Sequence, residues 1–167
     1  FKGETVSAGY LAEEAAHIEC DILKRPMGKQ DHYIAAYGGI NYIRFYDDET
    51  VTVRPLNMTA KNLKILSNSI VIFWTGLTRP SEFVLKEQNE NNRSNEDILK
   101  KMKDQAQKLS RILTEPELSI KDVGAQINQG WEYKKKLAST ITSPAIDGWY
   151  DKAKKHGALG GKISGAG

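Results

Sequence analysis

A lone carboxylate at the start of a short helix is the residue of this sequence most suited to chemistry. Asp31 follows Pro26 and Gly28, which favour a break in the chain, and precedes an apolar run that ends at Tyr37. We therefore predict Asp31 in the first helical turn, where free backbone N–H groups favour an anion. A carboxylate in that position can orient a substrate hydroxyl or accept its proton. A second interpretation, that Asp31 only complements the helix dipole, stays open.

Residues 157–167 form a second unusual segment, in which five positions are glycine. Glycine at this density suits neither a regular helix nor a strand, because it destabilises the interior of both. A backbone without side chains can instead pack closely against a nucleotide phosphate or another loop. The alternative is a flexible tail, which is common for glycine-rich segments near chain ends.

The elements that must position these groups can be predicted from apolar spacing. A helix is expected from Ser7, as its N-cap, to Leu23, with Cys20 as a buried thiol. Five consecutive apolar residues, Ile70–Trp74, predict a fully buried strand. The other predicted elements are hairpin strands at 40–46 and 50–54, helices at 60–66, 81–88 and 120–137, a helix capped by Ser94 that runs to Leu113, and a helix that begins at Pro144 and ends at Gly157.

Composition argues against several classes of partner. The 167 residues carry a net charge of +3 with 27% charged residues, so both signs are mixed, and we expect no nucleic-acid partner. The longest apolar run is too short to cross a bilayer and the single cysteine cannot form an internal disulfide, so we expect no membrane partner and a cytoplasmic location. The three histidines lack the spacing of metal ligands, so none is assigned to a metal.

Several short motifs are distributed along the whole length of the chain. They read GKQD at 28–31, AAYGGINYI at 35–43, TGLTR at 75–79 and GALGGK at 157–162, with AEEAAHIE at 12–19 and GWEYKK at 130–135. Together they resemble the superfamily of galactokinase, homoserine kinase, mevalonate kinase and phosphomevalonate kinase, the GHMP kinases. Within it they are most similar to the heptose kinase branch, which phosphorylates the anomeric hydroxyl of a heptose 7-phosphate.

The resemblance implies an α+β fold with the two-layer architecture of GHMP kinases, incomplete in this chain. Residues 1–67 would be the later part of the N-terminal lobe and residues 68–167 the C-terminal lobe up to its last glycine motif. The Gly- and Ser-rich phosphate loop of the superfamily has no counterpart here, and the sequence does not begin with methionine. We therefore expect the chain to be the middle and later part of a larger enzyme. His32 stands where relatives commonly carry glutamine.

The resemblance also implies a function and a set of site residues. It implies an ATP-dependent sugar kinase that acts with Mg²⁺ on a heptose 7-phosphate in the biosynthesis of nucleotide-activated heptose, and this chain alone is expected to be inactive. Another sugar 1-kinase, of the galactose or fucose type, and a non-catalytic regulator that binds sugar or nucleotide are the alternatives, and a homodimer stays open. The residues implied are Asp31 and Lys29 for catalysis; Gly160, Gly161, Gly165, Ala166 and Gly167 for the nucleotide; and Gly38, Gly39, Thr75, Gly76, Arg79, Lys134 and Lys162 for the substrate.

Overall fold

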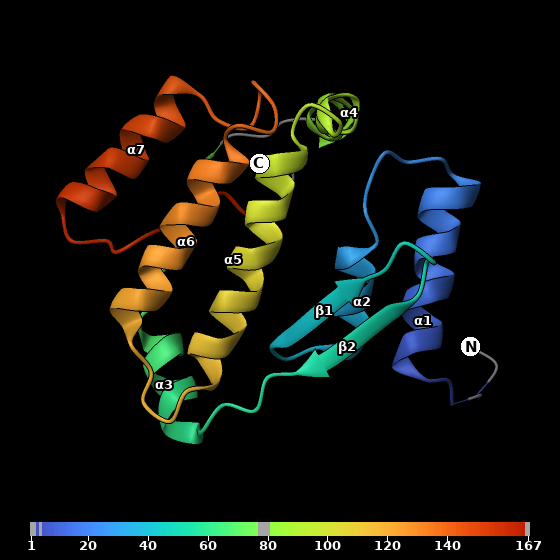
Figure 1. Cartoon of the computed structure of the whole chain (residues 1–167), viewed down its shortest axis with the longest axis horizontal. Coiled ribbons are helices and arrows are strands. Elements are labelled where there is room, and N and C mark those ends of the chain that lie inside the picture. Colours follow the sequence, from blue (N-terminus) through green and yellow to red (C-terminus); the bar gives the residue numbers. More distant parts are fainter. Residues whose placement is uncertain (1–2, 4, 77–80, 166–167) are drawn as a thin grey trace. The chain divides into compact units, whose positions relative to one another are not determined.

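The computed structural model of this chain describes residues 3, 5–76 and 81–165 (Figure 1). The contacts within it divide the chain into two compact units, Phe1–Leu56 and Asn57–Gly167. Helices and a two-stranded antiparallel sheet make up the regular structure of the described residues, which confirms the predicted α+β class. The sequence places a lobe boundary after residue 67, whereas the compact units divide after Leu56; the assignment of two lobes stays a prediction.

The first unit begins with a helix that changes its winding halfway. α1 (Ala8–Ala16) starts after Ser7, whose Oγ accepts a hydrogen bond from the Tyr10 N–H at 3.1 Å, so the predicted N-cap is confirmed. The helix continues directly as a π-helical segment, η1 (His17–Ile22), which the sequence did not predict. Such wide turns are rare and occur frequently at functional sites.

The next helix carries the candidate carboxylate. α2 (Gln30–Tyr37) packs against α1 and has Asp31 in its first turn, as predicted. It ends at Gly38 and Gly39, whose φ angles of +61° and +70° lie in the region that favours glycine. The glycine pair therefore terminates α2 and turns the chain into the hairpin.

A β-hairpin completes the first unit. β1 (Asn41–Phe45) pairs antiparallel with β2 (Val51–Pro55), which confirms the predicted hairpin. The Phe45 ring meets the ring of Tyr33 on α2 edge-on, with 5.7 Å between the centroids. Because Tyr33 is only 3% exposed, the sheet and α2 share one small core.

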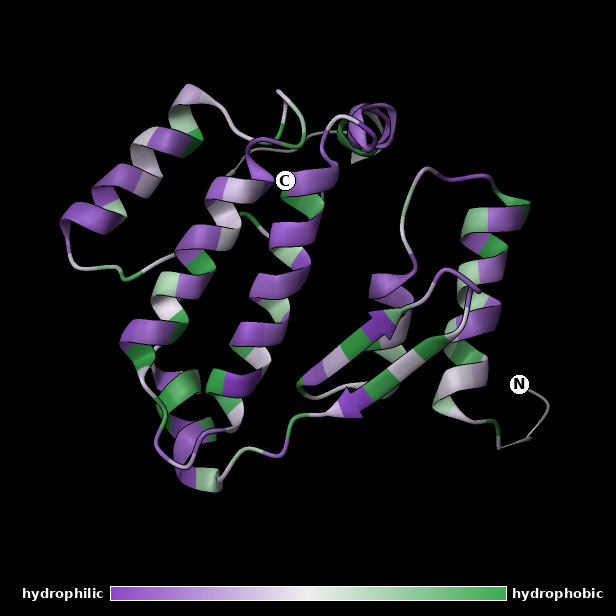
Figure 2. Ribbon diagram, in the orientation of Figure 1, coloured by the Kyte–Doolittle hydropathy of each residue, from purple (hydrophilic) through white to green (hydrophobic). Residues whose placement is uncertain are grey.

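The second unit is helical in its described residues. α5 (Glu96–Thr114) and α6 (Ile120–Lys134) lie side by side (Figure 1). Hydrophobic and hydrophilic residues alternate along α5 in Figure 2, as expected for a helix that buries one face. The other helices of this unit are α3 (Ala60–Asn68), α4 (Ser81–Asn91) and α7 (Pro144–Lys155).

The predicted start of α7 at Pro144 and its predicted end at Gly157 are confirmed. The Ser143 Oγ accepts a hydrogen bond at the start of α7, and Gly157, with φ +98°, follows its last turn. The Ser94 prediction was wrong. The Ser94 hydroxyl donates to the Asn91 carbonyl at 2.9 Å, and Asn95 holds the N-cap position of α5. The reason is that α4 runs further than predicted, so its last carbonyl groups compete for the serine.

The core of the second unit surrounds Trp131, which is 1% exposed. The other two tryptophans of the chain, Trp74 and Trp149, are 81% and 47% exposed and belong to the same unit. Tryptophan fluorescence therefore reports the second unit, and its change on unfolding arises mainly from Trp131. The buried residues packed together here are Val84, Trp131, Leu137, Ala138, Ile141 and Ile146.

The predicted strand Ile70–Trp74 is not formed. These residues pair with no described strand, and their exposed fractions range from 54% to 90%. The prediction was wrong because it considered only the apolar side chains. A buried strand also needs neighbouring backbone to satisfy its N–H and C=O groups, and no described segment of this chain supplies it.

Asn62 connects α3 to the loop between α5 and α6. Its side chain, in a residue 1% exposed, donates from Nδ2 to the carbonyl oxygens of Glu115 and Pro116 at 2.9 and 3.3 Å. We expect Asn62→Ala to lower the free energy of unfolding by about 1–3 kcal/mol, because buried hydrogen bonds are lost without replacement. Urea denaturation followed by tryptophan fluorescence measures this change.

Asn68→Ala, at the exposed end of the same helix, is the matched control for this substitution. It should change the free energy of unfolding by less than about 0.5 kcal/mol. Equal losses for the two variants would contradict the role given to the Asn62 side chain.

Candidate functional site

A groove between α1 and α2 contains the candidate carboxylate. Its volume is about 420 Å³. Asp31 lines it from the first turn of α2, where the side chain is exposed and makes no hydrogen bond or ion pair with another described residue. An anion favoured by the helix N-terminus and left without a partner can accept a hydrogen bond from a bound hydroxyl. The lining residues are Leu11, Ala15, Glu19, Met27, Asp31, His32, Ala35 and Ala36.

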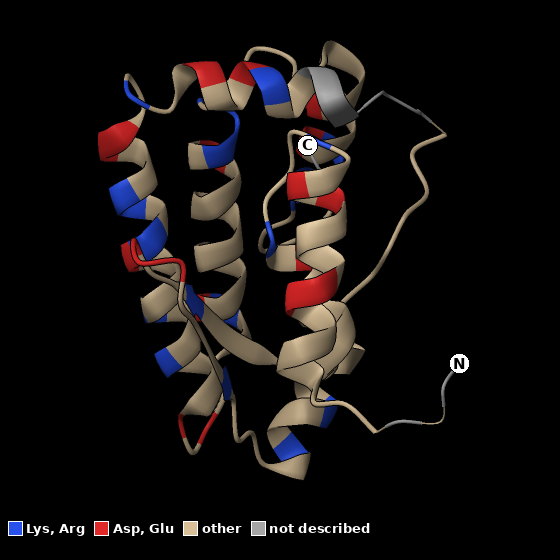
Figure 3. Cartoon of the chain, turned by 90° about the vertical axis from the view of Figure 1, so that its right-hand side faces the viewer, with Lys and Arg blue, Asp and Glu red and all other residues tan. Residues whose placement is uncertain are grey.

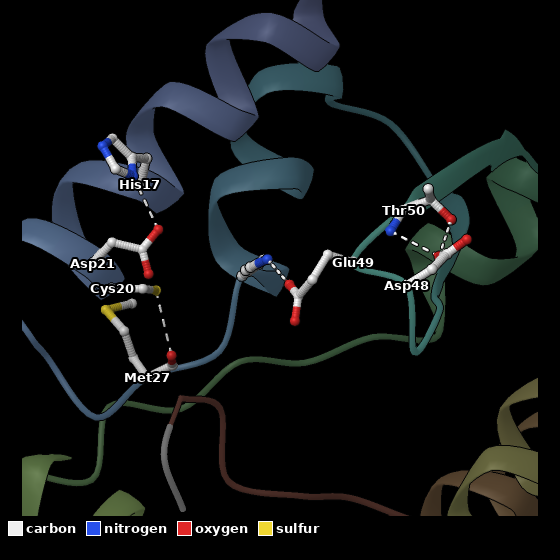
Figure 4. Close-up of polar contacts among 8 residues, drawn as sticks. His17, Cys20, Asp21, Met27, Asp48, Glu49 and Thr50 are labelled. Atoms are coloured by element: carbon white, nitrogen blue, oxygen red, sulfur yellow. Dashed lines mark hydrogen bonds and ion pairs between the residues drawn. The ribbon is translucent and has the colours of Figure 1, made fainter.

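Lys29 holds the N-cap position of α2, two residues before Asp31. Its Nζ forms an ion pair with the carboxylate of Glu49, in the turn of the hairpin (Figure 4). This carboxylate raises the pKa of Lys29 above its ordinary value. Lys29 is thus a cation already paired with an acid, and its predicted catalytic role stays a prediction.

The π-helical segment brings polar groups to one end of the groove. The Glu19 carboxylate accepts hydrogen bonds from His32 Nε2 and Arg25 Nη1, each at 3.0 Å. On the same segment His17 Nδ1 lies 2.9 Å from the Asp21 carboxylate, a contact drawn in Figure 4. Asp21 is thereby held ionised, and its hydrogen bond with His17 lowers its pKa below the ordinary value.

Cys20, on the π-helical segment, differs from its prediction. It was expected to be buried among apolar neighbours, but it is half-buried, while Ile18 and Ile22 are 47% and 61% exposed. Its Sγ donates to the Met27 carbonyl at 3.4 Å (Figure 4). Desolvation, reinforced by the Asp21 charge, raises the pKa of the Cys20 thiol. The prediction assumed α-helical spacing, whereas these residues lie in a segment with π-helical winding.

In the second unit, the glycine-rich segment packs directly on α6. A Cβ atom at Gly160 would lie 2.1 Å from the Gly124 carbonyl oxygen and 2.8 Å from the Asn128 nitrogen. Likewise, a Cβ atom at Gly124 would lie 2.3 Å from the Cβ of Leu159. Two glycines, one on the helix and one on the segment, therefore allow the backbones to approach more closely than any side chain would permit.

Two lysines and a tyrosine hold the same segment. Lys134 Nζ on α6 donates to the Gly165 carbonyl at 3.2 Å, and Lys154 Nζ on α7 donates to the Leu159 carbonyl at 2.8 Å. Tyr150 on α7 lies 3.4 Å from the Cβ position of Gly161. The segment is thus fixed through its carbonyl groups, with cationic side chains beside it.

The amide groups of this segment differ from its carbonyls in their hydrogen-bond partners. None of the N–H groups of residues 159–165 donates to a backbone carbonyl among the described residues. Gly165 has φ +90° and open space around its Cβ position. The Gly161 N–H donates to the Tyr150 hydroxyl. The other N–H groups of these residues, in a glycine-rich turn beside lysines, can favour a bound anion.

The predicted site residues fall into both compact units. Asp31, Lys29, Gly38 and Gly39 belong to the first unit. Gly160, Gly161, Gly165 and Lys134 come together in the second, where Gly76 and Lys162 are exposed and Thr75 is partly exposed. Arg79, Ala166 and Gly167 lie outside the described residues.

The described residues were also compared with the requirements of a metal site and of a membrane-spanning helix. They contain no group of three or more His, Cys, Asp or Glu side chains that could hold a metal ion. None of the helices in the described ranges is long and apolar enough to span a bilayer. Acidic and basic residues both occur along the helices seen in Figure 3.

Sequence reasoning missed three residues of these sites. Glu19 lies four and eight residues after Ala15 and Leu11, and this spacing could have placed it on the groove face of the helix. Gly124 lies inside a helical pattern, and a glycine there can signal close packing against another segment. The contact of His32 with Glu19 spans 13 positions and has no local signal.

Comparison with known proteins first finds a family that matches the end of the chain. Residues 114–167 match the family described as GHMP kinases C terminal. The matched residues include all of α6, all of α7 and the glycine-rich segment that packs on them. This match and those to individual proteins confirm the resemblance to the GHMP kinase superfamily.

Two individual proteins are similar to nearly the whole of this chain. A D-glycero-alpha-D-manno-heptose 7-phosphate kinase of Campylobacter jejuni is 31% identical over 160 residues, which cover 94% of this chain and 46% of that protein. A solved structure, described as a D-glycero-D-manno-heptose 1-phosphate kinase from Bacteriodes thetaiotaomicron, is 26% identical with a TM-score of 0.57; the match covers 98% of this chain and 44% of that one. This chain therefore spans about half the length of the relatives it matches.

Proposed function

We propose that the full-length protein is an ATP-dependent sugar kinase, which transfers the γ-phosphate to the anomeric hydroxyl of a heptose 7-phosphate. The observation that carries this proposal is the Asp31 carboxylate in the α1–α2 groove, which has no polar partner among the described residues, in a chain that resembles a heptose 7-phosphate kinase over 94% of its length. Phosphoryl transfer requires mainly positioning and charge stabilisation. Asp31 would hold the acceptor hydroxyl, as a hydrogen-bond acceptor or as a base.

The glycine-rich segment supports a nucleotide site in the second unit. Gly160 and Gly161 pack against α6 and α7, and the Gly161 N–H donates to the Tyr150 hydroxyl. The other amides of residues 159–165 donate to no described backbone carbonyl and could bind an anion such as a phosphate. ATP would supply the phosphoryl group, and Mg²⁺ would neutralise the developing charge. We assign no residue of this chain to Mg²⁺, because the described residues contain no suitable cluster of ligands. A reaction with these substrates is expected in the cytoplasm.

The choice of sugar can be tested with the full-length protein. A heptose 7-phosphate carries two negative charges that a neutral sugar lacks, and Lys or Arg side chains can meet them. We expect kcat/KM for the 7-phosphate to exceed that for the unphosphorylated heptose by about 10–100-fold, the effect of one charge-assisted hydrogen bond. Steady-state kinetics, with ³¹P NMR to identify the anomeric phosphate, measure this ratio.

Two other results of these kinetic measurements would each favour one of the alternative functions. Equal activity on galactose or fucose would move the protein to another branch of sugar 1-kinases. Binding of sugar phosphate and ATP without any transfer would make it a regulator. An unpaired carboxylate in the groove favours the enzyme over the regulator, because binding alone has no need of a base.

A further inference from the structure

The side chain next to Asp31 is buried and held from the neighbouring helix. His32 has a side chain only 7% exposed, and its Nε2 lies 3.0 Å from the Glu19 carboxylate. A carboxylate only accepts hydrogen bonds, so Nε2 carries the proton and donates it. The other ring nitrogen, Nδ1, is buried without a hydrogen-bond partner among the described residues. The contact with Glu19 is therefore the single polar anchor of this ring in the described structure.

Glu19 is itself fixed in position. It belongs to η1, directly after α1, and its other carboxylate oxygen accepts from Arg25 Nη1 at 3.0 Å. The Arg25 backbone N–H donates to the Glu19 carbonyl, also at 3.0 Å, so the same two residues are joined twice. Because Arg25 holds the Glu19 carboxylate in place, this carboxylate restricts the movement of the His32 ring that donates to it.

These contacts bear on Asp31 through the geometry of α2. Asp31 and His32 are adjacent in the first turn, and both line the groove together with Glu19. The Asp31 side chain makes no hydrogen bond or ion pair with another described residue, so its position depends on the backbone of that turn. The His32 ring is the group that connects this backbone to η1 through a hydrogen bond.

We propose that Glu19 is a positioning residue, which holds His32 and thereby fixes the first turn of α2 with Asp31 directed into the groove. The expected effect on turnover rests on the proposed kinase function. The hydrogen bond between Glu19 and His32 does not depend on that function. A displacement of a catalytic group by about 1 Å can cost on the order of 10²-fold in rate. Loss of the anchor should therefore lower kcat while the substrate-binding groups remain.

The kinetic test uses the full-length protein and four variants. Glu19→Ala and His32→Leu should each lower kcat by about 10–100-fold with KM within about threefold, because turnover rather than binding depends on the geometry. His32→Gln should stay within about threefold of wild type, since its amide N–H can still donate to Glu19. The double variant Glu19→Ala/His32→Leu should be no slower than either single variant, since both remove the same contact.

The matched control is His17→Ala on the same π-helical segment. The His17 side chain is 58% exposed and contacts only Asp21 among the described ion pairs, so kcat should not change. Losses in the two single variants that multiply in the double variant would overturn the proposal. An increase confined to KM would overturn it as well, because it would show lost binding rather than lost positioning.

A second measurement separates this proposal from the proposed function. Hydrogen exchange of the α2 amides should be about tenfold faster in Glu19→Ala than in wild type, as the loss of one hydrogen bond to a charged group predicts. Unchanged exchange would overturn the anchor. If wild-type protein transferred no phosphate to any sugar, the proposed function would fail, while faster exchange would still support the anchor at Glu19.

Discussion

Asp31→Asn in the full-length protein should lower kcat by about 10²–10⁴-fold, the usual range for loss of a general base. The amide is nearly isosteric with the carboxylate, but it cannot accept a proton. The Asp31 side chain has no partner among the described residues, so its replacement removes no structural contact. We therefore expect KM and the folded structure to change little. Steady-state kinetics and circular dichroism of the purified variant measure both.

Asp47→Asn is the matched control, an exposed aspartate in the hairpin turn of the same unit. Its kcat should equal that of wild type. If Asp31→Asn retained a rate within a few-fold of wild type while folded, the carboxylate would serve only the helix dipole. The second interpretation of this residue would then be correct.

Gly160→Ala should destabilise the second unit. The new methyl group would lie 2.1 Å from the Gly124 carbonyl oxygen and 2.8 Å from the Asn128 nitrogen, and both are backbone atoms of α6. Neither can move without displacing the helix, so we expect a loss of about 1–3 kcal/mol, as for other overpacked sites. Urea denaturation followed by the fluorescence of the buried Trp131 measures it.

Gly148→Ala adds the same methyl group as Gly160→Ala, but it should raise the stability instead of lowering it. Gly148 lies in α7 with nothing within 4 Å of its Cβ position. Alanine should stabilise that helix by about 0.5–1 kcal/mol, because it loses less backbone entropy on folding. The close packing of Gly160 on α6 would be refuted by a Gly160→Ala variant as stable as Gly148→Ala.

Features that depend on neighbours in the sequence could be predicted. The Ser7 and Ser143 caps bind N–H groups three residues further along the chain, so local composition contains the whole interaction. The same holds for Asp31, whose place in the first turn follows from the break before it and the glycine pair after it. These local rules gave the helix starts and the candidate carboxylate.

Features that depend on distant residues could not be predicted. The ion pair of Lys29 with Glu49 spans 20 positions, and the close approach of Gly124 and Gly160 joins a helix to a separate segment. The spacing of apolar residues along the sequence does not predict such contacts, because they depend on how the elements pack against one another. The wrong prediction at Ile70–Trp74 has the same origin, because whether an apolar run forms a strand depends on a partner elsewhere.

The unpaired segment Ile70–Trp74 also affects how this chain behaves in concentrated solution. Its five apolar side chains are at least 54% exposed, and its backbone pairs with no described strand. Uncharged, proline-free runs of this kind act as templates on which further molecules add as strands. Aggregation of these 167 residues should therefore begin at this segment. A charged residue in place of Ile72, which is 90% exposed, would act as a gatekeeper at no cost to the core.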